Sequence, residues 1–129
     1  MMDKKKSFVL VVEDDHNSQM LMNYYLRESY EIDFAVSVTE AKEKLISQDA
    51  DIILLDLSLE GGEDGLDLVK YMRTKDKFRS ISVIATTAHA FTADREKCLE
   101  AGCNDYISKP IKKDKLLKMM SKYHNGNQS

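Results

Sequence analysis

Apolar and polar residues follow two alternating patterns along this chain. Short strand-like runs, most of them apolar, occur five times, and each is followed by a stretch with apolar residues at roughly helical spacing. The runs at residues 8–12 and 52–55 are continuously apolar, which is typical of strands buried on both faces of a parallel sheet. The other three expected strands lie at residues 32–36, 81–85 and 105–107.

The stretches after the strands have the signals of helices. Ser37 begins the second helix as part of a capping box with Glu40. Thr92 is expected to cap the fourth helix, and Gly102 is expected to end it in a left-handed conformation. The apolar stripes are Met20, Leu21, Tyr24 and Leu26; Val38, Ala41, Leu45 and Ile46; Leu66, Val69 and Met72; and Leu116, Leu117 and Met120.

This alternation predicts an α/β fold with the pattern (βα)5. Right-handed crossovers turn such a chain into a doubly wound, five-stranded parallel sheet with helices on both faces. We expect the strand order 2-1-3-4-5. The 129 residues suit a single domain, residues 1–129, with a core at about 8–123 and tails at 1–6 and 124–129.

Composition excludes several classes of protein. Hydrophobic residues make up 43% of the chain and charged residues 32%, which is typical of a globular domain. The net charge of −3 argues against a nucleic-acid partner, and the longest apolar run is far too short for a membrane span or a signal peptide. Cys98 and Cys103 do not form a disulfide framework. We therefore expect a cytoplasmic protein.

Candidate chemistry follows from the residues just beyond each strand, because ligands of open parallel sheets bind at the carboxyl ends of the strands. With the first and third strands adjacent, Glu13, Asp14 and Asp56 would converge in one acidic pocket. Three carboxylates repel one another unless a hard cation such as Mg²⁺ binds among them. Thr87 and Lys109, which follow the fourth and fifth strands, would add a hydroxyl and an ammonium at the opposite rim.

This set of groups is suited to phosphoryl transfer. A cation, an ammonium and a hydroxyl together can hold a phosphoryl group, and a carboxylate beside them is a competent nucleophile. Four segments of the chain resemble the receiver domain of response regulators in two-component signalling: Val11-Val12-Glu13-Asp14-Asp15, Leu54-Leu55-Asp56, Thr87-Ala88 and Tyr106-Ile107-Ser108-Lys109-Pro110. The resemblance covers about residues 8–123 and implies a flavodoxin-like sheet.

The resemblance also implies a role for each of these residues. Asp56 would accept a phosphoryl group from a histidine kinase or a histidine phosphotransfer protein, in a Mg²⁺-dependent reaction. The chain would then be a signalling phosphoacceptor that catalyses only its own phosphorylation and slow dephosphorylation. Metal ligands would be Glu13, Asp14, Asp56 and the carbonyl of Ser58; Thr87, the Ala88 amide and Lys109 would hold the phosphoryl group. Lys109-Pro110 resembles the cis-prolyl bond of the family.

The resemblance also implies how phosphorylation would be passed on to a downstream partner. Thr87 and Tyr106 would form the switch, and a downstream partner would bind the surface of the fourth helix, the fifth strand and the fifth helix. The stretch from Thr87 to Gly102 is similar to receivers attached to hybrid kinases, which exchange phosphate with phosphotransfer domains. Ser58 and His89 are expected to set the lifetime of the phosphate. The paired Met1-Met2 and the polar end favour a stand-alone protein.

The sequence departs from the family pattern in one loop. Receivers commonly have a proline shortly after the phosphoacceptor aspartate and a glycine eight residues after it. Here Leu59-Glu60-Gly61 has no proline, and Gly65 comes nine residues after Asp56. We therefore expect this loop to be one residue longer than usual.

Three other functions place different demands on the same residues. A phosphatase of the haloacid type needs a second acid two residues after its nucleophile, and Ser58 stands there. A flavin binder needs a phosphate loop after the first strand, where residues 13–15 would repel phosphate. The alternative that stays open is a phosphate-independent protein-binding module on a receiver scaffold.

Overall fold

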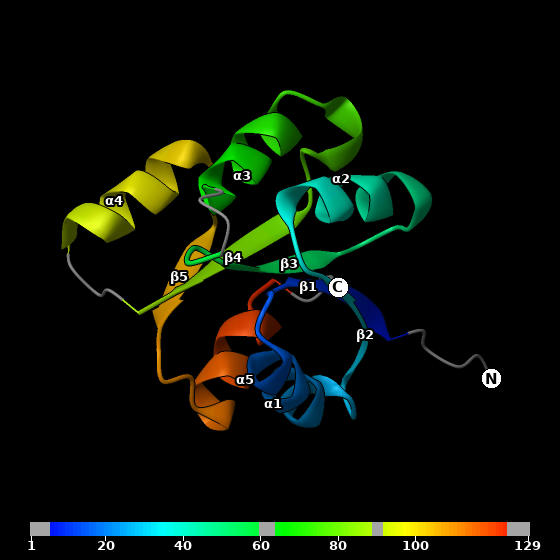
Figure 1. Cartoon of the computed structure of the whole chain (residues 1–129), viewed down its shortest axis with the longest axis vertical. Helices are drawn as coiled ribbons and strands as arrows, with labels where there is room; N and C mark the ends of the chain where they lie inside the picture. Colours follow the sequence, from blue (N-terminus) through cyan, green and yellow to red (C-terminus); the bar gives the residue numbers. More distant parts are fainter. Residues whose placement is uncertain (1–5, 60–63, 89–91, 124–129) are drawn as a thin grey trace.

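A computed structural model of the chain describes residues 6–59, 64–88 and 92–123. Its five strands are all parallel and form one sheet in the order β2-β1-β3-β4-β5, as expected (Figure 1). The strands are β1 (Ser7–Val12), β2 (Tyr30–Ala35), β3 (Ile52–Asp56), β4 (Ser82–Thr87) and β5 (Asp105–Ser108).

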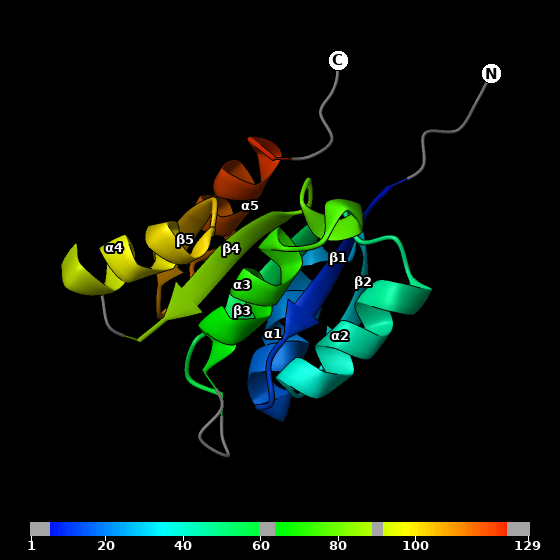
Figure 2. The ribbon, with the colours of Figure 1, turned by 90° about the horizontal axis from the view of Figure 1, so that it is seen from above.

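Helices cover both faces of this sheet. The α-helices are α1 (His16–Leu26), α2 (Val38–Ser47), α3 (Gly65–Arg73), α4 (Thr92–Ala101) and α5 (Lys113–Ser121), with a short 3-10 helix, η2 (Asp76–Phe78), before β4. Helices α1 and α5 lie on one face, and α2, α3 and α4 lie on the other (Figures 1 and 2). No helix in the described ranges is long and apolar enough to cross a membrane.

The sheet separates two apolar cores. All five residues of β3 are buried, and the side chains of its four apolar residues, 52–55, alternate between the two cores. Leu10, Ile53 and Leu55 pack under α2, α3 and α4, whereas Val11 and Leu54 pack under α1 and α5. Burial on both faces explains why the first and third strands are continuously apolar in the sequence.

Local signals begin and end the helices largely as expected. The Ser37 hydroxyl accepts a hydrogen bond from the Glu40 amide at 3.0 Å, which confirms the cap of α2. Gly102 follows α4 with a φ of 114° and confirms the left-handed end of that helix. Thr92 is the first residue of α4 rather than the residue before it, and the preceding residue lies outside the described ranges.

Three expectations about apolar faces are wrong. Met20, Leu21 and Tyr24 of α1 are exposed, whereas Leu26 of the same expected stripe is buried; its buried partner on the helix is Met22, four positions earlier. Ile46 is exposed because Val38, Ala41 and Leu45 already define the inner face of α2. Strand β2 ends at Ala35, so Val36 lies outside it in the turn to α2 and is exposed.

A single arginine ties together the loop before β4 and the loop before β5 at the amino edge of these strands. The Arg73 guanidinium donates to the carbonyls of Arg79 and Ile81 at 2.9 Å each and to that of Gly102 at 3.0 Å. It also donates to the side-chain oxygen of Asn104, which in turn accepts from the Val83 amide. Because these carbonyls belong to loops, the arginine replaces the hydrogen bonds that a strand or helix would supply.

We predict that Arg73→Met lowers the free energy of unfolding by about 2–4 kcal/mol, because methionine keeps the apolar stem but leaves several carbonyls without a donor. Lys70→Met, at an exposed position of the same helix, is the matched control and should change stability by less than about 0.5 kcal/mol. Urea unfolding of both variants measures the difference. Equal effects would contradict a structural role for the Arg73 hydrogen bonds.

Candidate functional site

Three carboxylates meet at the carboxyl edge of the sheet. Strands β1 and β3 are neighbours with Val12 beside Leu55, so the next residues, Glu13 just after β1 and Asp56 at the end of β3, lie side by side. Oxygen atoms of Glu13, Asp14 and Asp56 all lie within 4.8 Å of one another. Glu13 and Asp56 are buried, at 5% and 3% exposure, and Asp14 is half-buried. The convergence expected from the topology is therefore present.

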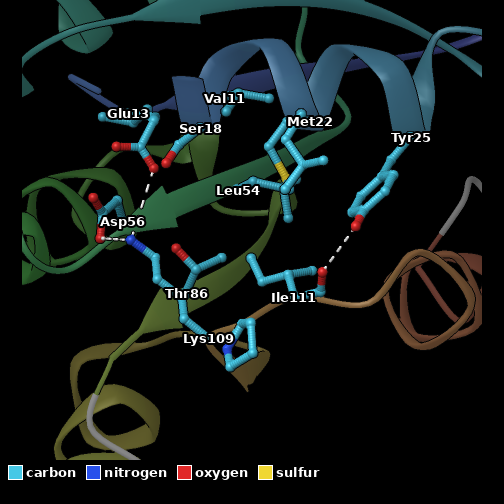
Figure 3. A pocket seen from close by; sticks show the side chains of 13 residues that line it. Val11, Glu13, Ser18, Met22, Tyr25, Leu54, Asp56, Thr86, Lys109 and Ile111 are labelled. Carbon is cyan, nitrogen blue, oxygen red and sulfur yellow. Dashed lines mark hydrogen bonds and ion pairs between the residues drawn. The ribbon is translucent and has the colours of Figure 1, made fainter. Parts of the chain in front are cut away.

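Lys109 supplies the positive charge in this cluster. Its Nζ lies 3.1 Å from Asp56 Oδ1 and 3.9 Å from Glu13 Oε1 (Figure 3). The backbone of Lys109 is held where β5 ends, since its amide donates to the Thr87 carbonyl at 2.7 Å. The peptide bond from Lys109 to Pro110 is cis, as expected.

Backbone amides orient the two buried carboxylates. The Ser58 amide donates to Asp56 Oδ1 at 2.9 Å, and the Asp15 amide donates to Glu13 Oε2 at 3.1 Å. Asp15 itself caps α1 through its side chain, which accepts from the Ser18 amide. The turns after β1 and β3 therefore fix the orientation of Glu13 and Asp56 through backbone amides. Helix α1 begins directly after the first of these turns.

The environment of Glu13 disfavours its charged form. Burial is the main cause and, together with the negative charge of Asp56, raises the pKa of Glu13 from 4.5 to about 7. The hydrogen bond from the Asp15 amide and the charge of Lys109 act in the opposite direction. With three carboxylates and one ammonium, the cluster keeps an excess of negative charge and of hard oxygen donors, which fits a divalent cation such as Mg²⁺.

The two threonines that end β4 occupy different places. Thr86 is the register neighbour of Asp56 and lines the same cavity, a position that the sequence analysis did not single out (Figure 3). Strand register would have found it, because paired residues of parallel strands project from the same face. Thr87 is buried one residue further on, and Ala88 is exposed.

The remaining candidates lie around this centre. Ser58 is exposed two residues after Asp56. Tyr106 is half-buried on β5, beside Ala85, and packs against the core under α2, α3 and α4. His89 and residues 60–63 of the loop after β3 lie outside the described residues, so the loop length stays a prediction.

Comparison with known proteins decides the family. The profile of the response regulator receiver domain matches residues 9–121. The chain belongs to this family. Receiver domains are signalling phosphoacceptors of two-component phosphorelays; they bind Mg²⁺ at an acidic pocket and interact with histidine kinases or phosphotransfer proteins and with downstream partners.

Similar receiver domains occur both alone and inside larger proteins. The polar-differentiation response regulator DivK of Brucella ovis is 30% identical over 118 residues, which cover 92% of this chain and 95% of DivK. The hybrid signal transduction histidine kinase L of Dictyostelium discoideum is 36% identical over 127 residues, and the match spans 92% of this chain but only 7% of that kinase. Similarity alone therefore leaves the surrounding architecture open.

A solved relative carries the metal. The receiver domain of a sensor histidine kinase from Pseudomonas aeruginosa PAO1 is 32% identical, with a TM-score of 0.82, and covers 92% of this chain and 97% of that one. That structure has a magnesium ion coordinated in its active-site cleft. In this chain, Glu13, Asp14 and Asp56 offer carboxylate oxygens, which are donors that Mg²⁺ prefers.

We predict that Glu13→Gln stabilises the metal-free receiver domain at high pH. A pKa raised in the folded state means that the wild type loses stability as pH rises from about 4.5 to about 7, and glutamine has no charge to gain. In chelator at pH 8 the variant should be more stable by about 1–2 kcal/mol, and the gap should shrink towards pH 5. Thermal unfolding at several pH values measures this difference in the free energy of unfolding. A difference that does not change with pH would contradict the raised pKa of Glu13.

Proposed function

We propose that this chain is the phosphoacceptor of a phosphorelay and that Asp56 is the residue modified. A carboxylate oxygen of Asp56 attacks the phosphorus of a phosphohistidine; the new O–P bond forms as the P–N bond breaks, and the imidazole leaves. The observation that supports this most directly is that buried Asp56 adjoins both the acidic cluster and Lys109. The donor is a histidine kinase or a histidine phosphotransfer protein.

The residues around Asp56 are assigned to the metal ion, to the phosphoryl oxygens or to the lifetime of the phosphorylated product. Glu13, Asp14, Asp56 and the carbonyl of Ser58 would hold Mg²⁺, which supplies positive charge against the phosphoryl oxygens. Lys109, already in contact with Asp56, pairs with the charge that develops on the transferred group. The Thr87 hydroxyl and the Ala88 amide are assigned to the remaining phosphoryl oxygens. Ser58 and His89 are assigned to the lifetime of the product.

Exposed apolar side chains suggest where the phosphodonor docks. Met20 and Leu21 of α1 are large and exposed, and Leu21 also lines the cavity that contains Asp56. A donor that delivers a phosphoryl group to Asp56 must approach this edge of the sheet, so we assign the surface of α1 at Met20 and Leu21 to the donor. The surface of α4, β5 and α5 is assigned to the downstream partner, which makes the chain a switch or a relay.

We predict that Asp56→Asn abolishes phosphorylation by acetyl phosphate in the presence of Mg²⁺, because the amide cannot act as the nucleophile. Asp15→Asn is the matched control, since asparagine also caps a helix and Asp15 lies outside the acidic cluster; it should be modified at close to the wild-type rate. Intact-mass spectrometry detects the added phosphoryl group. Modification of Asp56→Asn at another carboxylate would refute the assignment, and an unmodified wild type would favour the phosphate-independent binding module.

We predict that Thr87→Ala uncouples partner binding from phosphorylation while Asp56 is still modified. A Thr87 hydroxyl that moves towards the phosphoryl group vacates space that Tyr106, on the neighbouring strand, can enter. Phosphate then stabilises the inward ring by differential contact, with coupling of about 1–3 kcal/mol. In the wild type, NMR should show a phosphate-dependent change at the Tyr106 ring. Identical ring signals with and without phosphate would rule out this switch.

A further inference from the structure

Tyr25 links α1 to the segment that carries Lys109. Its hydroxyl donates a hydrogen bond of 3.1 Å to the carbonyl of Ile111, which lies 86 residues away in the sequence and two residues after Lys109 (Figure 3). The Tyr25 ring is half-buried and packs against the core under α1 and α5. The hydroxyl therefore joins two elements that the strand ladder does not connect.

The segment from Lys109 to Ile111 is supported unequally on its two sides. On the side of the sheet, the Lys109 amide donates to the Thr87 carbonyl. Pro110 has no N–H to donate. On the side of α1 there is a cavity of about 290 Å³, whose apolar wall includes Val11, Met22, Leu54 and Ile111 and whose polar end contains Glu13, Asp56 and Lys109. Ile111 and Tyr25 both pack against the core under α1 and α5, and the Tyr25 hydrogen bond adds a polar link between α1 and the segment beside this cavity.

We propose that Tyr25 is a positioning residue for Lys109. By holding the Ile111 carbonyl at α1, the tyrosine sets the place from which the Lys109 side chain reaches Asp56 and Glu13. Without that bond the segment can shift towards or away from the cavity, and the ammonium leaves the position 3.1 Å from Asp56 Oδ1. The inference rests on the proposed function, because it gives Tyr25 a part in phosphoryl transfer through Lys109.

The chain provides a matched control for this residue. Tyr24 is the neighbouring tyrosine, but it is 59% exposed, and its ring lies near the cations of Arg27 and of Lys113, the first residue of α5. Replacing either tyrosine by phenylalanine keeps the ring and removes one hydroxyl. A difference between the two variants therefore reports the Tyr25 hydrogen bond and not the loss of an aromatic side chain from α1.

The test measures the rate at which acetyl phosphate modifies Asp56 in the presence of Mg²⁺. A small donor is chosen because α1 is also the surface assigned to the protein donor, and an effect on docking would confuse the result. Tyr25→Phe should lower the rate about three- to tenfold, and Tyr24→Phe should leave it within about twofold of the wild type. A Tyr25→Phe rate equal to that of the wild type would overturn the inference.

A double-mutant cycle separates positioning from a general effect on the fold. If Tyr25 acts through Lys109, then Tyr25→Phe should cause no further loss in a Lys109→Ala background. The same fold-loss in both backgrounds would show that the tyrosine acts on the fold and would overturn the inference. Thermal unfolding of each variant establishes that the proteins compared are folded.

NMR of the Lys109 side chain gives a readout that needs no phosphorylation. The Cε and Hε signals of Lys109 should shift in Tyr25→Phe and stay in place in Tyr24→Phe. Should the wild type itself take no phosphoryl group, the proposed function is wrong, and these signals still decide the positioning: no shift in Tyr25→Phe would overturn it.

Discussion

Two buried carboxylates, Glu13 and Asp56, share one ammonium, that of Lys109, and the rest of the site depends on this arrangement. Burial disfavours the charged form of Glu13 and raises its pKa to about 7. Asp14 adds a third carboxylate, so one ammonium leaves an excess of two negative charges when all three are ionised. A divalent cation would cancel that excess and allow an anionic phosphoryl donor to approach. The same electrostatics thus account for the metal requirement that we propose and for the metal-free instability predicted at high pH.

The fold brings these groups together through its strand order. Because β1 and β3 are neighbours, two turns that are distant in sequence place their carboxylates at one edge, and β4 and β5 bring Thr86 and Lys109 to the same edge. The strands can hold this charged cluster because they are buried on both faces by separate apolar cores. Far from the site, Arg73 satisfies the carbonyls of the loops at the opposite edge, so the charged groups are concentrated where they have a function.

Sequence patterns predict the parts of this molecule that depend on local signals. Continuous apolar runs identify the buried strands, and a carboxylate directly after such a run can be placed at the sheet edge before any coordinates are known. Faces of short helices are harder to predict, because several registers fit a few apolar positions. On α1 the spacing predicts a stripe of Met20, Leu21, Tyr24 and Leu26, but only Leu26 of these is buried, together with Met22. Arg73 and Tyr25 could not be recognised, since their partners are carbonyls, and every residue has one. Only the tertiary structure shows which carbonyls lack a donor.

The geometry around Lys109 links the two surfaces assigned to partners. The Lys109 amide donates a hydrogen bond to the carbonyl of Thr87, which belongs to the proposed switch. Two residues further on, the Ile111 carbonyl accepts a hydrogen bond from Tyr25 of α1, the helix that carries the surface assigned to the donor. Loss or gain of contact on α1 can therefore reach the ammonium at Asp56 through one hydrogen bond, and a change at Asp56 can reach α1 by the same route. Any such coupling is reciprocal: a donor that binds α1 more tightly when Lys109 is in place must also favour that placement of Lys109. The segment from Lys109 to Ile111 would then have two roles: it places the Lys109 ammonium at Asp56, and it transmits changes in position between Asp56 and α1.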